Sequence, residues 1–171
     1  MHRLLIVGVL TASCGSDGGS DPSPDAPYDT VRCLIAGNYG SLGAKSGNNV
    51  QGPNTLTITL DDGPPKDSFF LKLVAGRGVF AAGLAPGTYT IGGDDTNLMT
   101  CGLCTTIIAD IVAMAGPTKF YYANAGSITI TSVQPPAGSL SNLSFVEISS
   151  GGSPIPNGCT ATMDAMTFSS M

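Results

Sequence analysis

The chain has 171 residues with 23 glycines, 12 prolines, a formal net charge of −5 and only 11% charged residues. This length is typical of one domain, and the 42% hydrophobic share supplies a core and excludes a fully disordered chain. The acidic balance argues against nucleic-acid binding, which needs a basic surface that displaces counterions.

The first fourteen residues have the order of a secretory signal. His2 and Arg3 precede a short apolar run at 4–10, and small residues then lead to Cys14. The run is too short for a permanent membrane-spanning helix, which needs about 20 residues. A signal peptide is therefore expected at 1–13, and a soluble protein cleaved elsewhere is the alternative.

The cysteine at the end of this signal makes it resemble the signal of a bacterial lipoprotein. In that family the cysteine is acylated and becomes the mature N-terminus, which implies lipidation of Cys14. Thr11 departs from the pattern, because the usual leucine stands one residue earlier, as Leu10. Gly15 follows the cysteine where an aspartate would signal retention in the inner membrane, so the resemblance implies anchoring to the outer membrane.

Residues 14–29 are rich in Gly, Ser, Asp and Pro and contain almost nothing to bury. They are expected to form a disordered, acidic tether, followed by a folded domain at 30–171. His2 is the only histidine and leaves with the signal. Serine or cysteine catalysis assisted by histidine and histidine-containing zinc sites are therefore excluded, and we expect neither an enzyme nor a cofactor.

From residue 30 onward, short runs alternate apolar and polar residues and are bounded by Gly, Pro or Asn, which is typical of half-buried strands. The segment 103–115 fits a strand buried on both faces better than the alternative of a short helix. The fold class is therefore predicted to be all-β, a two-sheet β-sandwich of nine or ten short strands. The predicted strands are 31–36, 54–60, 68–74, 78–82, 87–91, 103–115, 120–123, 127–133, 138–149 and 159–168.

Four cysteines remain after Cys14, and an even number in an exported domain predicts disulfides with three possible connectivities. We favour Cys33–Cys159, because these residues open the first and last predicted strands, together with a local Cys101–Cys104 bond. A Cys-x-x-Cys pair can also exchange thiols and disulfides, so a periplasmic thiol–disulfide oxidoreductase is an alternative. The absence of a βα pattern around the pair favours a structural bond.

Acidic residues give a second alternative, a calcium-dependent adhesion domain. Asp94, Asp95 and Asn97 offer oxygen ligands of the kind that calcium prefers, and Asp110 lies within an apolar run nearby in sequence. An ordinary hairpin turn explains the first three residues equally well. Glu147 is the only glutamate, and no second carboxylate can be matched to it for glycoside hydrolysis.

The arrangement is similar to uncharacterised bacterial lipoproteins that carry a cysteine-stapled β-domain on a Pro/Asp/Gly tether. The segments 84–91, 101–104 and 126–133 carry this likeness, which implies an architecture and no activity. The expected function is a binding, adhesive or structural module of the cell envelope. Its expected partners are the membrane, through the N-terminal lipid, and an envelope protein or glycan.

Overall fold

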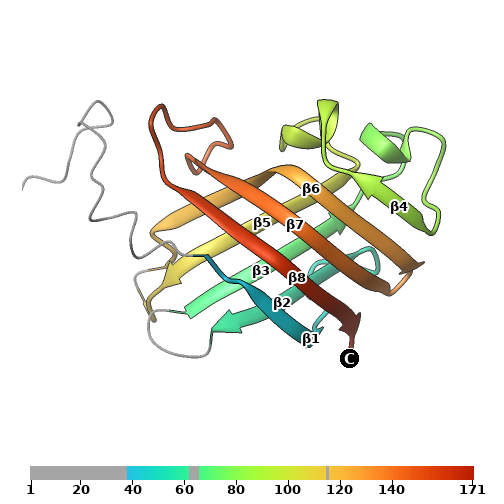
Figure 1. The fold of residues 1–171 in the computed structure, drawn as a ribbon, viewed down its shortest axis with the longest axis horizontal. Coiled ribbons are helices and arrows are strands. Elements are labelled where there is room, and N and C mark those ends of the chain that lie inside the picture. Colours follow the sequence, from blue (N-terminus) through green and yellow to red (C-terminus); the bar gives the residue numbers. More distant parts are fainter. Residues whose placement is uncertain (1–37, 62–65, 115) are drawn as a thin grey trace, which may run out of the picture.

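Strands form most of the computed structural model, which describes residues 38–61, 66–114 and 116–171 (Figure 1). Two short 3₁₀ helices, η1 (Gly78–Phe80) and η2 (Gly93–Thr96), lie between the third and fifth strands. The predictions for Cys14, the tether, Cys33 and the strand at 31–36 lie outside the described residues. The strands of the described part are β1 (Ser41–Gly47), β2 (Thr55–Asp61), β3 (Lys66–Leu73), β4 (Gly87–Thr90), β5 (Leu103–Ile111), β6 (Lys119–Val133), β7 (Pro136–Ile148) and β8 (Thr160–Ser170).

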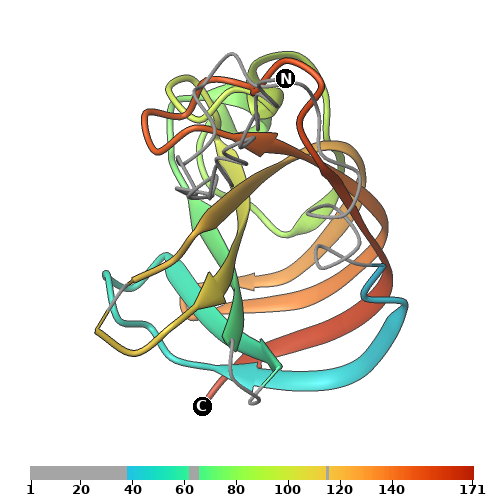
Figure 2. The same ribbon diagram turned by 90° about the vertical axis from the view of Figure 1, so that its left-hand side faces the viewer.

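All eight strands belong to one sheet with the order β1-β8-β7-β6-β5-β3-β2, and β4 pairs with the far half of β6. The pairs are antiparallel except β1 with β8, which is parallel. The sheet rolls up until it is nearly barrel-shaped (Figure 2). The all-β class is confirmed. The described strands form one sheet and not the two separate sheets of the expected sandwich.

The reason for the single sheet lies in β6 and β7, with 15 and 13 residues. The register between them shifts at Ala123, Ala125 and Ile130, and such bulges bend a strand and increase its twist. Gly126, at φ 112°, lies within the first bend, and a side chain there would meet the backbone of Asn142. One bent strand therefore replaces the two strands predicted at 120–123 and 127–133.

The roll closes where β1 meets β2. Asn48 exchanges both backbone hydrogen bonds with Thr57, at 3.0 and 2.9 Å. The preceding residue, Gly47, has no room for a side chain, because a Cβ would overlap the carbonyl oxygen of Thr57 and press on Ile58. A glycine at this position allows the two edge strands to approach, so the closure depends on it.

The interior of the roll is filled by apolar side chains from six strands. Alternate residues of β5 point inward, and Leu103, Thr105 and Ile107 are fully buried. The largest completely buried side chains are Tyr121, Phe69, Phe80, Phe145, Phe168, Leu56, Ile58 and Leu71. This packing makes the interior a core rather than a ligand chamber.

Two further expectations are corrected. The predicted strand at 103–115 is β5, which ends at Ile111, so the helical alternative is wrong. The run at 78–82 is not a strand but forms η1, and β1 was not predicted. No helix in the described part of the chain has the length and apolar character needed to cross a membrane.

Candidate functional site

The carboxylate of Asp95 in η2 accepts three hydrogen bonds from the backbone. Asp95 is 2% exposed. Its Oδ1 accepts hydrogen bonds from the backbone N–H groups of Gly102 and Leu103, both at 2.7 Å, and Oδ2 accepts one from Val79 at 2.9 Å. Hydrogen bonds to an ionised carboxylate are stronger than those between neutral groups. One carboxylate therefore fastens η1, η2 and the start of β5 together.

The predicted Cys101–Cys104 disulfide is present, with 5.3 Å between the Cα atoms. It joins the end of the segment 97–101 to the outer face of β5. Cys101 is 1% exposed and Cys104 is 5% exposed. An attacking thiolate must reach a sulfur atom, so this burial protects the bond from exchange and favours a structural role.

Beneath this segment lies a small apolar cluster on the outside of the sheet. It comprises the two cysteines, Tyr122 and Ile148, with Val74 and Phe120 packed against it. Tyr122 and its neighbour Tyr121 are both buried. Burial, followed by the negative charge of Asp95, raises the pKa of Tyr122 above its ordinary value. Its hydroxyl has no hydrogen-bond partner within the described residues.

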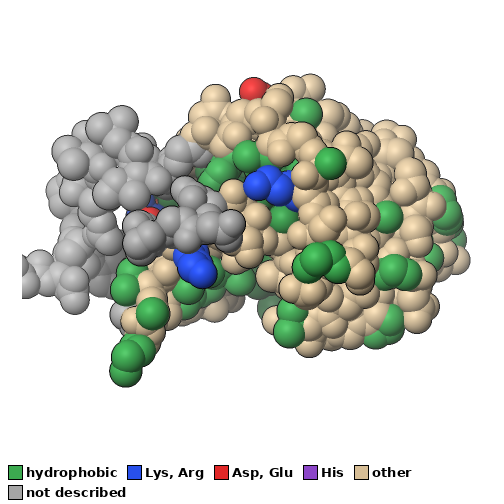
Figure 3. All heavy atoms as spheres, turned by 90° about the horizontal axis from the view of Figure 1, so that it is seen from below, with side chains coloured by type: hydrophobic (Ala, Val, Ile, Leu, Met, Phe, Trp, Pro, Cys, Tyr) green, Lys and Arg blue, Asp and Glu red, His purple; other side chains and the backbone are tan. Residues whose placement is uncertain are grey.

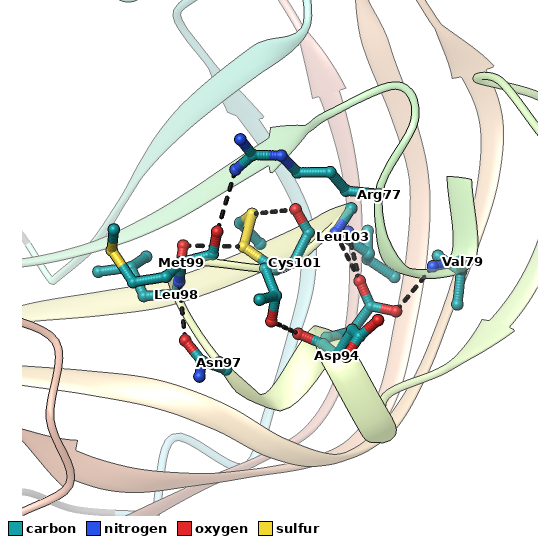
Figure 4. The surroundings of a disulfide bond; sticks show 12 residues. Arg77, Val79, Asp94, Asn97, Leu98, Met99, Cys101 and Leu103 are labelled. Carbon is teal, nitrogen blue, oxygen red and sulfur yellow. Dashed lines mark hydrogen bonds between the residues drawn. A yellow bond between two sulfur atoms is a disulfide. The ribbon is translucent and has the colours of Figure 1, made fainter. Parts of the chain in front are cut away.

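The same segment carries no charged side chain and exposes the apolar side chains of Leu98 and Met99 beside the polar Asn97 and Thr100. Met99 is 72% exposed, and its carbonyl oxygen accepts a 3.0 Å hydrogen bond from the Arg77 guanidinium (Figure 4). Leu98 is partly exposed and packs against Gly152 of the connection between β7 and β8, which also presents Ile155. We call Leu98, Met99 and Ile155 the loop surface. The sequence did not predict this surface. The only sign of it in the sequence is a pair of adjacent apolar residues, Leu98 and Met99, within a turn.

The four candidate calcium ligands do not come together. The Asp95 carboxylate is directed at backbone N–H groups, and Asn97 Oδ1 accepts a 2.8 Å hydrogen bond from the backbone N–H of Met99. Asp94 is exposed, and Asp110 lies near the other end of β5. Within the described residues, no group of three or more His, Cys, Asp or Glu side chains could hold a metal ion.

Asp110 instead belongs to a hydrogen-bonded group at that other end of the roll. Its backbone N–H donates to Asp67 Oδ1 at 2.8 Å, and the Tyr39 hydroxyl donates to Asp67 Oδ2 at 2.7 Å. Burial, then the hydrogen bond to Asp67 and its negative charge, raise the pKa of Tyr39 well above its ordinary value. The group ties the chain entering β1 to β3 and β5.

Glu147 and Cys159 meet at the same end. The backbone N–H of Cys159 donates to Glu147 Oε2 at 2.8 Å, and the buried Lys119 places its Nζ 3.8 Å from the Cys159 sulfur. Cys159 takes part in a disulfide whose other half lies outside the described residues. The pairing of Cys159 with Cys33 therefore stays a prediction.

Comparisons of this chain with protein-family models, with curated proteins and with solved structures found no match.

Proposed function

We propose that the protein is an outer-membrane lipoprotein of a bacterium, anchored through a lipid on Cys14, and that its β-domain displays the loop surface to a protein or glycan of the cell envelope. This role is binding, adhesive or structural, with no catalytic step. The signal-like residues 1–13 and the Pro/Asp/Gly-rich segment that follows support the anchoring part.

One observation carries the display part. The segment 97–101 exposes Leu98 and Met99, yet it is fastened by a disulfide, by the Arg77 guanidinium and, through the adjoining residues 102 and 103, by the Asp95 carboxylate. Preorganised surfaces bind with a smaller entropic cost than mobile ones. An apolar surface supported in this way fits recognition of a partner.

The anchoring part is tested by mass spectrometry of the protein isolated from its native membranes under non-reducing conditions. We expect a diacyl or triacyl mass on Cys14 and complete oxidation of Cys101 and Cys104. A Cys14→Ser variant serves as the control and loses the acyl mass. An unlipidated chain cleaved elsewhere contradicts anchoring, and a mixture of thiol and disulfide at Cys101 and Cys104 instead favours the oxidoreductase alternative.

The display part is tested with a photocrosslinking amino acid introduced in cells at Met99 and, in a matched control, at Val50. Both side chains are 72% exposed, but Val50 lies in the turn between β1 and β2. We expect adducts at position 99 and not at position 50, and adducts sensitive to protease or to muramidase identify a protein or a glycan partner. Equal labelling at the two positions, or none, would sink this part of the proposal.

A further inference from the structure

The turn between β5 and β6 also exposes large apolar side chains. Met114 is fully exposed at 107% and Val112 is 48% exposed. Residues 111–118 carry no charged side chain. Hydrophobic side chains stand at a tip that projects from the body of the molecule (Figure 3). We call Val112 and Met114 the apolar tip.

The backbone holds the tip in an unusual conformation. Met114 has φ 71°, in the left-handed region that side chains other than glycine rarely adopt. The turn is closed by the pair Val112 and Gly116, with hydrogen bonds of 3.3 and 3.1 Å. A turn that places a methionine, rather than a glycine or asparagine, at a left-handed position points to a use for that side chain.

The position at which the chain enters the domain lies at the same end of the roll as the tip. Asn38, the first described residue, pairs with Thr162 of β8, and the next residue, Tyr39, bonds to Asp67. Asp67 in turn accepts a hydrogen bond from Asp110, one residue before Ile111 and the tip. In the register of β3 and β5, Ile111 lies opposite Lys66, whose side chain is exposed.

We infer that the apolar tip inserts into the interface of the lipid bilayer to which the protein is anchored. The inference rests on the proposed function, because residues 15–37 join Cys14 to Asn38. The end of the roll that carries Asn38 is then the end nearest the membrane.

The composition of the chain provides a clean optical test, because it contains no tryptophan. A Met114→Trp variant of the full chain, purified with its lipid, places the only tryptophan at the tip. A Met99→Trp variant is the matched control, since Met99 is an exposed methionine in a different loop. Val112→Trp provides a second tip position if Met114→Trp does not fold.

The variants are reconstituted with vesicles of phosphatidylethanolamine and phosphatidylglycerol that carry brominated acyl chains. We expect blue-shifted emission and quenching by about half for a tryptophan at the tip, since interfacial side chains reach the acyl boundary. Met99→Trp is expected to show neither change. Equal quenching of the tip and control tryptophans, or none at the tip, overturns the inference.

Flotation of the same vesicles separates this inference from the anchoring on which it rests. If the chain floats with the vesicles but the tip tryptophan is not quenched, anchoring stands and insertion of the tip is wrong. If the chain does not float, anchoring fails and the inference fails with it. A Cys14→Ser chain shows how much flotation the lipid contributes.

Discussion

Two exposed methionines lie in turns that are held in place by very different interactions. Met99 belongs to a segment held by a disulfide and by the Arg77 guanidinium, and Gly102, which follows this segment, donates a hydrogen bond to the buried carboxylate of Asp95. Met114 belongs to a turn closed by one pair of backbone hydrogen bonds, with Met114 itself in a left-handed conformation. Figure 2 shows the two regions well apart, with the disulfide-bearing loops at the top and the β5–β6 turn at the lower left.

This difference in how firmly the two turns are held indicates which kind of partner each one can contact. A fixed surface fits a partner of fixed shape, because little conformational entropy is lost on binding. A small turn with few contacts fits a fluid bilayer, which demands exposed apolar side chains and no particular geometry. Three predictions test how differently the two regions are held, from the largest expected effect to the smallest, and a fourth follows from the tyrosines of the third.

Removal of the Asp95 carboxylate should have the largest effect. Asp95→Ala leaves three backbone N–H groups buried without an acceptor, which we expect to lower the free energy of unfolding by about 3–6 kcal/mol. Asp94→Ala is the matched control, because that neighbouring side chain is exposed, and it should change stability by less than about 0.5 kcal/mol. Urea unfolding measures both variants, and equal stabilities would contradict the role assigned to Asp95.

Glycine substitutions should separate the two regions next. In Gly102→Ala the new Cβ would overlap the backbone carbonyl oxygen of Arg77, and we expect a loss of about 3 kcal/mol. Gly116 in the β5–β6 turn has φ 79° but open space around it, so Gly116→Ala should cost only about 1 kcal/mol. Thermal melts of both variants test this order, and a larger loss at position 116 would show that the tip is the more constrained region.

The third prediction compares the half-buried Tyr39 with the buried Tyr122, one near each region. Tyr39→Phe removes the hydrogen bond to Asp67 and should destabilise the protein by about 1 kcal/mol at pH 7. Tyr122→Phe removes a buried hydroxyl that has no partner among the described residues, so it should be neutral or slightly stabilising. Unfolding curves at pH 7 give both values, and the opposite order would contradict the assigned environments.

The same two tyrosines predict a loss of stability in alkali. Both folded-state pKa values are raised above that of the unfolded chain, so the folded protein keeps protons that the unfolded chain releases. The contribution of these tyrosines to the free energy of unfolding is therefore complete below pH about 10. Above that pH it falls by up to about 1.4 kcal/mol per pH unit for each tyrosine. Each Phe variant should show a shallower fall than the native chain when unfolding is followed from pH 9 to 11.5.

Local sequence patterns were sufficient to predict most of the strands. Alternation located β2, β3, β4, β7 and β8 to within a few residues, and the β-branched residues of the segment 103–111 correctly favoured a strand. The same reasoning failed for β1, whose sequence SLGAKSG shows little alternation. Its pairing with β8 stabilises it, and a pattern within one segment contains no information about such a distant partner.

The candidate site was predictable only in part. The spacing of Cys101 and Cys104 predicted their bond correctly, because a local pair needs no knowledge of the fold. Asp95 was proposed as a calcium ligand, whereas its acceptor atoms face N–H groups of Val79 and Gly102, which only folding brings close. Asp110 lies near Asp95 in sequence but at the other end of an extended strand, where it meets Asp67.

The sequence by itself determined the all-β class, the local disulfide and the positions of most strands, because these depend on alternation and on short spacings. The tertiary structure alone decided that the strands form one rolled sheet, that a buried carboxylate fastens the disulfide-bearing loop, and which apolar side chains remain exposed. These features arise from bends within long strands and from contacts between residues far apart in the chain, which no local pattern records.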